Sequence, residues 1–102
     1  MSVFVLSLGR MVCTRGVAAV AQARPVLNRF ITTCLQRHRM GEWGDIDAHD
    51  IAANDGAAVT GQRVLSVYEL PDTIIDAHSD DCLWVITDAG HETTTVLWPS
   101  EY

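Results

Sequence analysis

The sequence predicts a single α+β domain that spans residues 1–102. Three observations support this class. Apolar residues recur at helical spacing in the first half, the hydrophobic period changes to two after residue 63, and the last third is rich in β-branched and aromatic residues. The content of 48% hydrophobic residues suits a core that needs neither a disulfide nor a metal. We expect an N-terminal strand, two or three short helices and then a three-strand antiparallel meander, with the helices on one face of the sheet.

The N-terminal stretch predicts a strand followed by a short helix. Residues 3–14, VFVLSLGRMVCT, are rich in Val, Phe and Leu and are interrupted by Gly9, so they predict a strand or two short strand pieces. Thr14 is a good N-cap residue for a helix over residues 14–23.

The second predicted helix has the clearest pattern in the chain. Pro25 suits its first turn, so the helix is expected to begin near Arg24 and to end near Gly41. Its apolar side chains fall on one half of the circumference: Val26, Leu27, Phe30, Ile31, Cys34 and Leu35. His38 lies on the same side, where we expect a hydrogen-bonded or half-buried histidine rather than a ligand.

The second half predicts one more helix and three strands. Residues 47–60 have a weak helical pattern that Gly61 would end, and Gly56 in its interior costs about 1 kcal/mol relative to alanine. The predicted strands are residues 63–70 (RVLSVYEL), 81–88 (DCLWVITD) and 92–99 (ETTTVLWP). Residues 88–91 suit a hairpin turn, whereas residues 71–80 are expected to form a longer, flexible or protruding loop.

Charge is divided sharply along the chain. Residues 1–41 contain six arginines and no acid, whereas residues 42–102 contain all thirteen acids and one arginine, for a net charge of −6. Either the arginines compensate the acids within the domain or across a dimer, or the acidic half faces a basic partner. The excess of acids disfavours non-specific nucleic-acid binding by the second half.

The cysteines and the hydropathy of the sequence indicate where in the cell the protein is expected. Cys13, Cys34 and Cys82 are odd in number and far apart, which indicates free thiols in a reducing compartment. No run of 18 apolar residues exists, so we expect no membrane-spanning helix. The acid-free start also has the composition of a transit peptide, but its strand-like pattern argues against one. We therefore expect a soluble, cytoplasmic protein.

The segment GEWGDID, residues 41–47, is the main candidate for contact with a protein partner. The candidate residues are Glu42, Trp43, Asp45, Asp47 and Asp50. We nevertheless favour a structural interpretation of the motif. In it Trp43 fills the core, Gly41 and Gly44 allow a tight backbone, and Asp45 or Asp47 caps the third helix.

The second function class is a small enzyme or a metal-binding protein that would use His78, Cys82 and His91. His78, Cys82 and His91 would form a metal site if strand pairing brought them together, but no known ligand spacing accompanies them, and we expect no metal or other cofactor. The chain has no nucleophile elbow, P-loop or dinucleotide glycine motif, so we predict no catalytic residues.

Nucleic-acid binding is the remaining alternative. It would use Arg24, Arg29 and Arg39, and it predicts a steep salt dependence that Arg29→Glu would abolish. The arginines form no single stripe, which makes this the weaker case.

Four stretches of the chain resemble, in order, a family of small uncharacterised bacterial proteins. They are LSLGRMVCTRGVAAV, LQRHRMGEWGDIDAHDIAAND, RVLSVYEL and LWVITDAGHETTTVLWPSEY. The family pattern is LG-x-VVAT-x-GAL, then RH-x-x-GDWG with an acidic helix and an ND pair, then LSAY, IWIITE and TT-x-LLP-x-EY. This chain departs from it in its acid-free first helices and in the long PDTIIDAHSDDC segment, where the family has a tight turn.

The resemblance has consequences for function. Such proteins are similar to ones found on plasmids and other mobile elements. We therefore expect a small non-enzymatic binding or regulatory protein that acts through a protein partner, and a homodimer is compatible with this role. An acidic protein of a mobile element also resembles, by analogy, an inhibitor of host defence of the anti-restriction or anti-CRISPR type.

Overall fold

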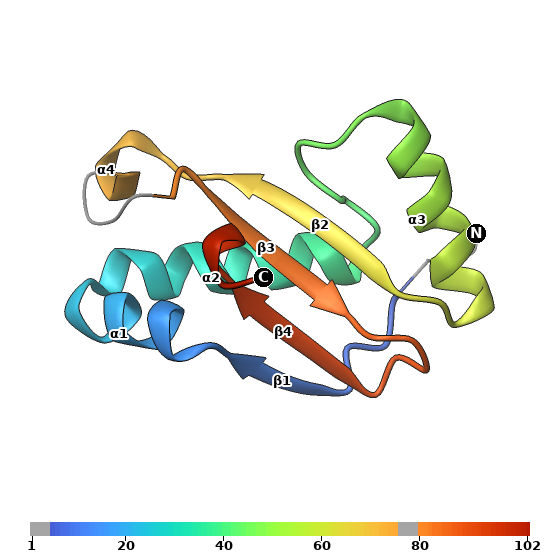
Figure 1. Ribbon diagram of the computed structural model, residues 1–102, viewed down its shortest axis with the longest axis horizontal. Helices are drawn as coiled ribbons and strands as arrows, with labels where there is room; N and C mark the ends of the chain where they lie inside the picture. Colours follow the sequence, from blue (N-terminus) through green and yellow to red (C-terminus); the bar gives the residue numbers. More distant parts are fainter. Residues whose placement is uncertain (1–4, 76–79) are drawn as a thin grey trace.

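Two helices in the first half begin where the sequence supplies suitable end residues. The hydroxyl of Thr14 accepts a hydrogen bond from the backbone N–H of Val17 at 3.3 Å and begins α1 (Arg15–Ala23). Pro25 is the first residue of α2 (Pro25–Arg39). The computed structural model describes residues 5–75 and 80–102, and α1 and α2 lie together on one face of a β-sheet (Figure 1).

The sheet has four strands in the order β1-β4-β3-β2. They are β1 (Arg10–Cys13), β2 (Val64–Glu69), β3 (Cys82–Thr87) and β4 (Thr93–Leu97). The pairs β2–β3 and β3–β4 are antiparallel, whereas β1 is parallel to β4. The α+β class is confirmed. The three later strands pair antiparallel in chain order as expected, but the N-terminal strand joins them, so the sheet is four-stranded and mixed.

The N-terminal strand is shorter than predicted. Only residues 10–13 of the predicted range 3–14 form a strand among the described residues. Gly9 has a φ of 60° and lies against the backbone of Glu92, whose oxygen would be 2.2 Å from an added Cβ atom. The chain therefore turns at Gly9, and residues 5–8 run over the end of α2 instead of extending β1.

The main core forms between the sheet and the two helices. Alternate strand residues point toward α1 and α2, as the period of two requires. The buried ones are Val64, Ser66, Tyr68, Leu83, Val85, Thr87, Thr94 and Val96. They meet the apolar side of α2, where Leu27, Ile31 and Cys34 are buried. Full burial of one such aliphatic side chain contributes about 1.5–3 kcal/mol.

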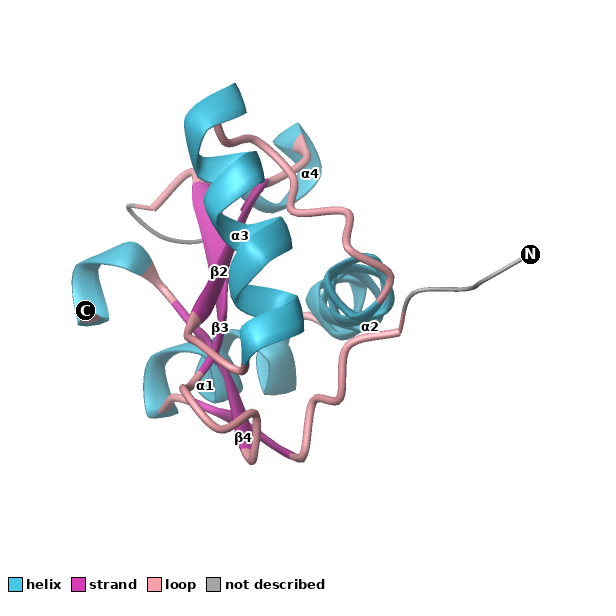
Figure 2. Cartoon of the chain, turned by 90° about the vertical axis from the view of Figure 1, so that its right-hand side faces the viewer, coloured by secondary structure: helices cyan, strands magenta, loops and turns pink. Residues whose placement is uncertain are grey.

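The third helix closes the outer edge of β2. α3 (Ala48–Thr60) begins at Asp47, whose carboxylate accepts from the N–H of Asp50 at 2.8 Å, and ends at Gly61 with a φ of 81°. Figure 2 shows α3 alongside β2. The Asn54 amide donates to the carbonyl of Leu65 at 2.7 Å and accepts from its N–H at 3.3 Å. One side chain thus satisfies both edge groups of that residue.

Asn54→Ala is expected to lower the free energy of unfolding by about 2 kcal/mol. The change leaves the N–H and C=O of Leu65 without these partners at a half-buried edge. Urea denaturation would measure it. His49→Ala, on the exposed side of α3, is the control and should change stability by less than about 0.5 kcal/mol. Equal stability of the two variants would show that Asn54 does not protect the edge.

The segment after β2 contains a helical turn that the sequence did not predict. α4 (Asp72–Ile75) follows Pro71, and the side chain of Ile74 is completely buried. The front half of the expected protruding loop is therefore anchored in the core. Residues 76–79, which include the metal candidate His78, lie outside the described residues.

The C-terminal tail is tied to the start of α1. The turn η1 (Pro99–Glu101) places the Glu101 carboxylate where it accepts from the Thr14 hydroxyl at 2.6 Å and from the Gly16 N–H at 3.2 Å. Desolvation raises the pKa of Glu101, but hydrogen bonds from Thr14, Trp98 and Gly16 outweigh it, so the pKa lies below its usual value. Among the described helices, none has the length and hydropathy to cross a membrane.

Candidate functional site

Three adjoining cavities lie between the segment before β1 and the C-terminal half of α2. Their volumes are about 450, 280 and 450 Å³. Arg39 lines all three, and shared residues connect each cavity to the next. We name this surface the β1–α2 groove and define it by Val5, Leu8, Met11, Leu35, Gln36, Arg39 and Met40.

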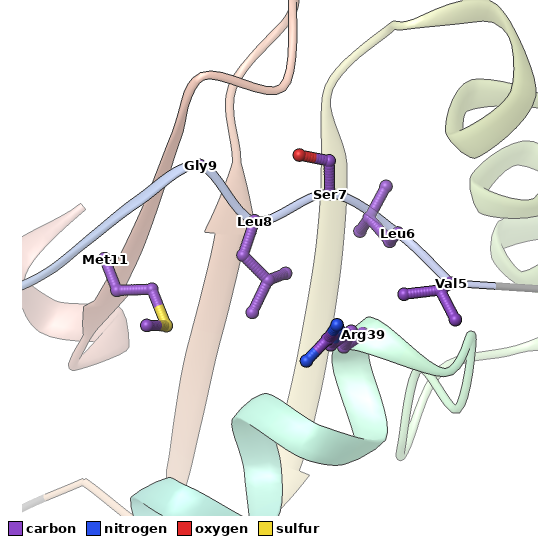
Figure 3. Close-up of a pocket in the computed structure, with 7 residues that line it drawn as sticks. All are labelled: Val5, Leu6, Ser7, Leu8, Gly9, Met11 and Arg39. Carbon is purple, nitrogen blue, oxygen red and sulfur yellow. The ribbon is translucent and has the colours of Figure 1, made fainter.

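The groove exposes large apolar side chains. Val5, Met11 and Met40 are 47%, 58% and 45% exposed, while Leu8 and Leu35 are half-buried. In Figure 3 the side chains of Val5, Leu8 and Met11 point toward the side where Arg39 lies, and Ser7 points away. Exposed apolar side chains grouped in this way are typical of interaction surfaces, and methionine adapts its shape to different contacts.

The groove borders the open edge of the sheet. β1 is the last strand in the sheet order, and Figure 1 shows no described element beside its outer edge. The N–H groups of Arg10 and Thr14 donate to the carbonyls of Glu92 and Val96, at 2.8 and 3.1 Å. Because a parallel ladder uses alternate residues, the backbone groups of Met11 and Cys13 point away from β4.

The two segments that form the groove have only positive charges. Every charged side chain between residues 5 and 41 is an arginine. Arg39 and Arg29 are exposed on α2, whereas Arg37 lies over the ring of Tyr68, 4.9 Å from its centroid, and 4.0 Å from the Glu42 carboxylate. Arg37 of the first half thus lies beside an acid of the second half.

The three arginines of the nucleic-acid alternative do not form one cluster in the structure. The guanidinium of Arg24 donates to the carbonyl of Thr73 in α4. Arg24 precedes α2 and Arg39 ends it, so they are about 22 Å apart at 1.5 Å per residue. Of the three predicted arginines, Arg39 alone lines the groove.

The predicted partner motif largely has structural roles. Trp43 is 3% exposed, and its indole N–H donates to Asp55 at 2.9 Å. Gly41 and Gly44 have φ values of 79° and 82°, and Asp47 caps α3. These parts of the structural interpretation are confirmed.

Asp45 has a different role from helix capping. Its N–H donates to the carbonyl of Val67 at 2.7 Å, and its carboxylate accepts from the N–H of Glu69 at 2.9 Å. It therefore completes the protection of the β2 edge. Trp43 is the buried member of the set, whereas its four acids are exposed, and none of the five residues lines the groove.

His38 connects four elements through a buried chain of hydrogen bonds. It is completely buried, with Nδ1 2.5 Å from the Ser66 hydroxyl and Nε2 2.8 Å from that of Thr87. Thr87 lies 2.7 Å from the hydroxyl of Thr94, which donates to the carbonyl of Leu8 at 2.7 Å. The chain thus runs from the core to the segment that lines the groove.

The direction of each bond in this chain follows from its last acceptor. The Leu8 carbonyl only accepts, so Thr94 donates to it and must accept from Thr87. Thr87 then accepts from Nε2–H of His38, and Nδ1 of the neutral ring accepts from Ser66. Burial lowers the pKa of His38 to about 4, with a smaller effect from His91. Ser66 and His38 form no accessible nucleophile–base pair, because both are completely buried.

The metal candidates that the structure describes lie far apart. Cys82 begins β3, whereas His91 follows its other end, and the His91 ring donates from Nε2 to the carbonyl of Gln62 at 2.7 Å. Strand pairing does not bring Cys82 and His91 together, because both lie along one antiparallel hairpin, at opposite ends of β3. Within residues 5–75 and 80–102, no three His, Cys, Asp or Glu side chains form a metal-binding group.

The three cysteines are free thiols in the structure. Cys34 is buried on α2, and this burial raises the pKa of its thiol to about 12, which makes it an unreactive core residue.

A second apolar surface lies on the sheet face opposite α2. Leu65, Val67 and Trp84 are half-buried there, and the Tyr102 ring packs edge-on against Trp84 at 5.4 Å. Arg63 lies over the same tyrosine ring at 5.1 Å. The charges that flank this surface on β2, Arg63 and Glu69, have opposite signs.

Comparison with known proteins gives no family for this chain: no family model, curated protein or solved structure matches it. The candidate site therefore rests on the geometry described above. The sequence did not reveal the groove, since its walls come from two segments that the turn at Gly9 brings together. The acid-free composition of residues 1–41 was the one signal of its charge.

Proposed function

We propose that this chain is a small, non-enzymatic protein-binding domain that holds its partner in the β1–α2 groove. The observation that carries the proposal is the grouping of Val5, Met11 and Met40, which expose close to half or more of their surface beside connected cavities. Leaving such side chains in water is unfavourable, and a partner that covers them gains about 25 cal/mol for each Å² of apolar surface buried.

The chemistry of the polar side chains supports binding over catalysis. The buried Ser66 and His38 have no path to a substrate, and Cys34 is a core thiol. The resemblance to proteins of plasmids and other mobile elements supports a finer proposal, in which the partner is a host protein of a defence system and the chain inhibits or regulates it.

A pull-down from the native host, with and without nuclease, tests this function. Wild type should retain a stoichiometric protein partner after nuclease treatment, and Met11→Glu should reduce its recovery by about tenfold, because the variant places a charge in the apolar groove. Tyr102→Glu is the matched control: Tyr102 is 69% exposed but lies on the opposite sheet face, so recovery should not change.

The opposite results would reject the proposal. Partner recovery that is the same for wild type and Met11→Glu would exclude the groove as the binding surface. Loss of all bound material on nuclease treatment would favour the nucleic-acid alternative.

A further inference from the structure

We infer that the β1–α2 groove binds an extended, acidic segment of the partner, which adds to the sheet as a fifth strand beside β1. This inference rests on the proposed protein-binding function and specifies the chemistry of the ligand. Two features of the groove carry it: a free strand edge and a positive charge.

The strand edge supplies backbone hydrogen bonds. The N–H and C=O groups of Met11 and Cys13 point outward from β1, and in the described chain no strand or helix pairs with them. The opposite edge of the same sheet is closed by Asn54, Trp43 and Asp45. β1 is therefore the one described edge to which a partner strand can add.

The groove supplies side-chain contacts at a spacing of two residues. On an added strand, alternate side chains would lie beside Met11, over the cavity of about 280 Å³ that Leu8 and Leu35 also line. A medium-sized apolar side chain suits a cavity of this composition. The intervening side chains would lie beside Arg10 and Val12, on the other face of β1.

Two ligands could add a strand to β1: a second copy of this chain, or an acidic segment of another protein. The arginines near β1 favour the acidic segment. A second copy of this chain, paired through its own β1, would bring Arg10 and Arg39 of each copy close to those of the other, which is unfavourable. An acidic segment would instead place its intervening carboxylates beside Arg10. Arg39, which lines every cavity of the groove, adds a second positive charge near the ligand.

Two labelled ten-residue peptides test the inference by fluorescence anisotropy, one of alternating leucine and glutamate and one of alternating leucine and lysine. The acidic peptide should bind the wild-type protein, and its affinity should fall as salt increases, whereas the basic peptide should not bind. Arg10→Glu should weaken binding of the acidic peptide by about tenfold or more, because the glutamates of the added strand would lie beside Arg10. Arg29→Glu makes the same charge change on α2 outside the cavities and should alter binding by no more than about twofold.

Methylation of the peptide backbone separates strand addition from simple surface attraction. Two forms of the acidic peptide would carry N-methyl groups at the odd or at the even residues. Because an added strand uses alternate N–H groups, one form should lose binding and the other should keep it. Equal binding of both methylated forms, or of the acidic and basic peptides, would overturn the inference.

Two further outcomes distinguish this inference from the proposed function. If neither peptide binds at up to about 1 mM, while Met11→Glu still reduces partner recovery, then strand addition is wrong and the protein-binding role stands. If sedimentation shows a wild-type dimer that Met11→Glu disrupts, then the groove binds a second copy, and the acidic ligand is wrong.

Discussion

Gly44→Ala is expected to lower the free energy of unfolding by about 3–4 kcal/mol. Gly44 has a φ of 82°, which strains any residue with a Cβ atom, and it pairs with Val67 beside β2. An added Cβ would lie 2.0 Å from the carbonyl oxygen of Val67 and 2.8 Å from the ring of Tyr68. The segment would have to move away, which would break the hydrogen bond from Asp45 to Val67 and expose the edge of β2.

Gly56→Ala is the matched control, since it adds the same methyl group at a helical position with nothing within 4 Å. It should stabilise the protein by up to about 1 kcal/mol, because alanine favours a helix more than glycine does. Urea denaturation of both variants and wild type would show that the two substitutions change the free energy of unfolding in opposite directions. A loss at Gly44 no larger than about 0.5 kcal/mol would contradict the close contact with Val67.

Stability is expected to depend on His38 between pH 6.5 and about pH 4. The pKa of His38 falls from 6.5 to about 4 in the folded protein, so in this window the unfolded chain binds more protons. Stability therefore rises with pH across the window, and as pH falls from 7 to 4 up to about 3 kcal/mol is lost. Protonation also places a charge at the centre of the buried chain that holds the carbonyl of Leu8.

A pair of glutamine variants isolates this effect. His38→Gln keeps hydrogen-bonding capacity toward Ser66 and Thr87 but cannot titrate, so its stability should change less than that of wild type between pH 7 and pH 4. His49→Gln, at an exposed position of α3, should follow the wild-type pH dependence. Unfolding measured by tryptophan fluorescence across this range provides the comparison. Parallel curves for wild type and His38→Gln would show that His38 does not contribute.

The sequence by itself determined the local elements. Helical spacing predicted α2, because its apolar side chains must lie on one side of the helix to be buried. Thr14, Pro25 and Gly61 marked helix ends through their own hydrogen bonds and backbone preferences. Alternation of side chains predicted β2, and β-branched and aromatic composition predicted β3 and β4. These signals depend on residues a few positions apart, so they can be recognised without knowing the rest of the fold.

The tertiary structure alone decided how distant segments meet. Pairing of β1 with β4, across about eighty residues, made the sheet mixed and left one edge open. Packing of residues 5–8 against α2 formed the groove, and the same packing gave Leu8 its contact with Thr94. Antiparallel pairing within a single hairpin separated Cys82 from His91. Such contacts depend on which buried surfaces fit together, and no local period or spacing specifies that fit.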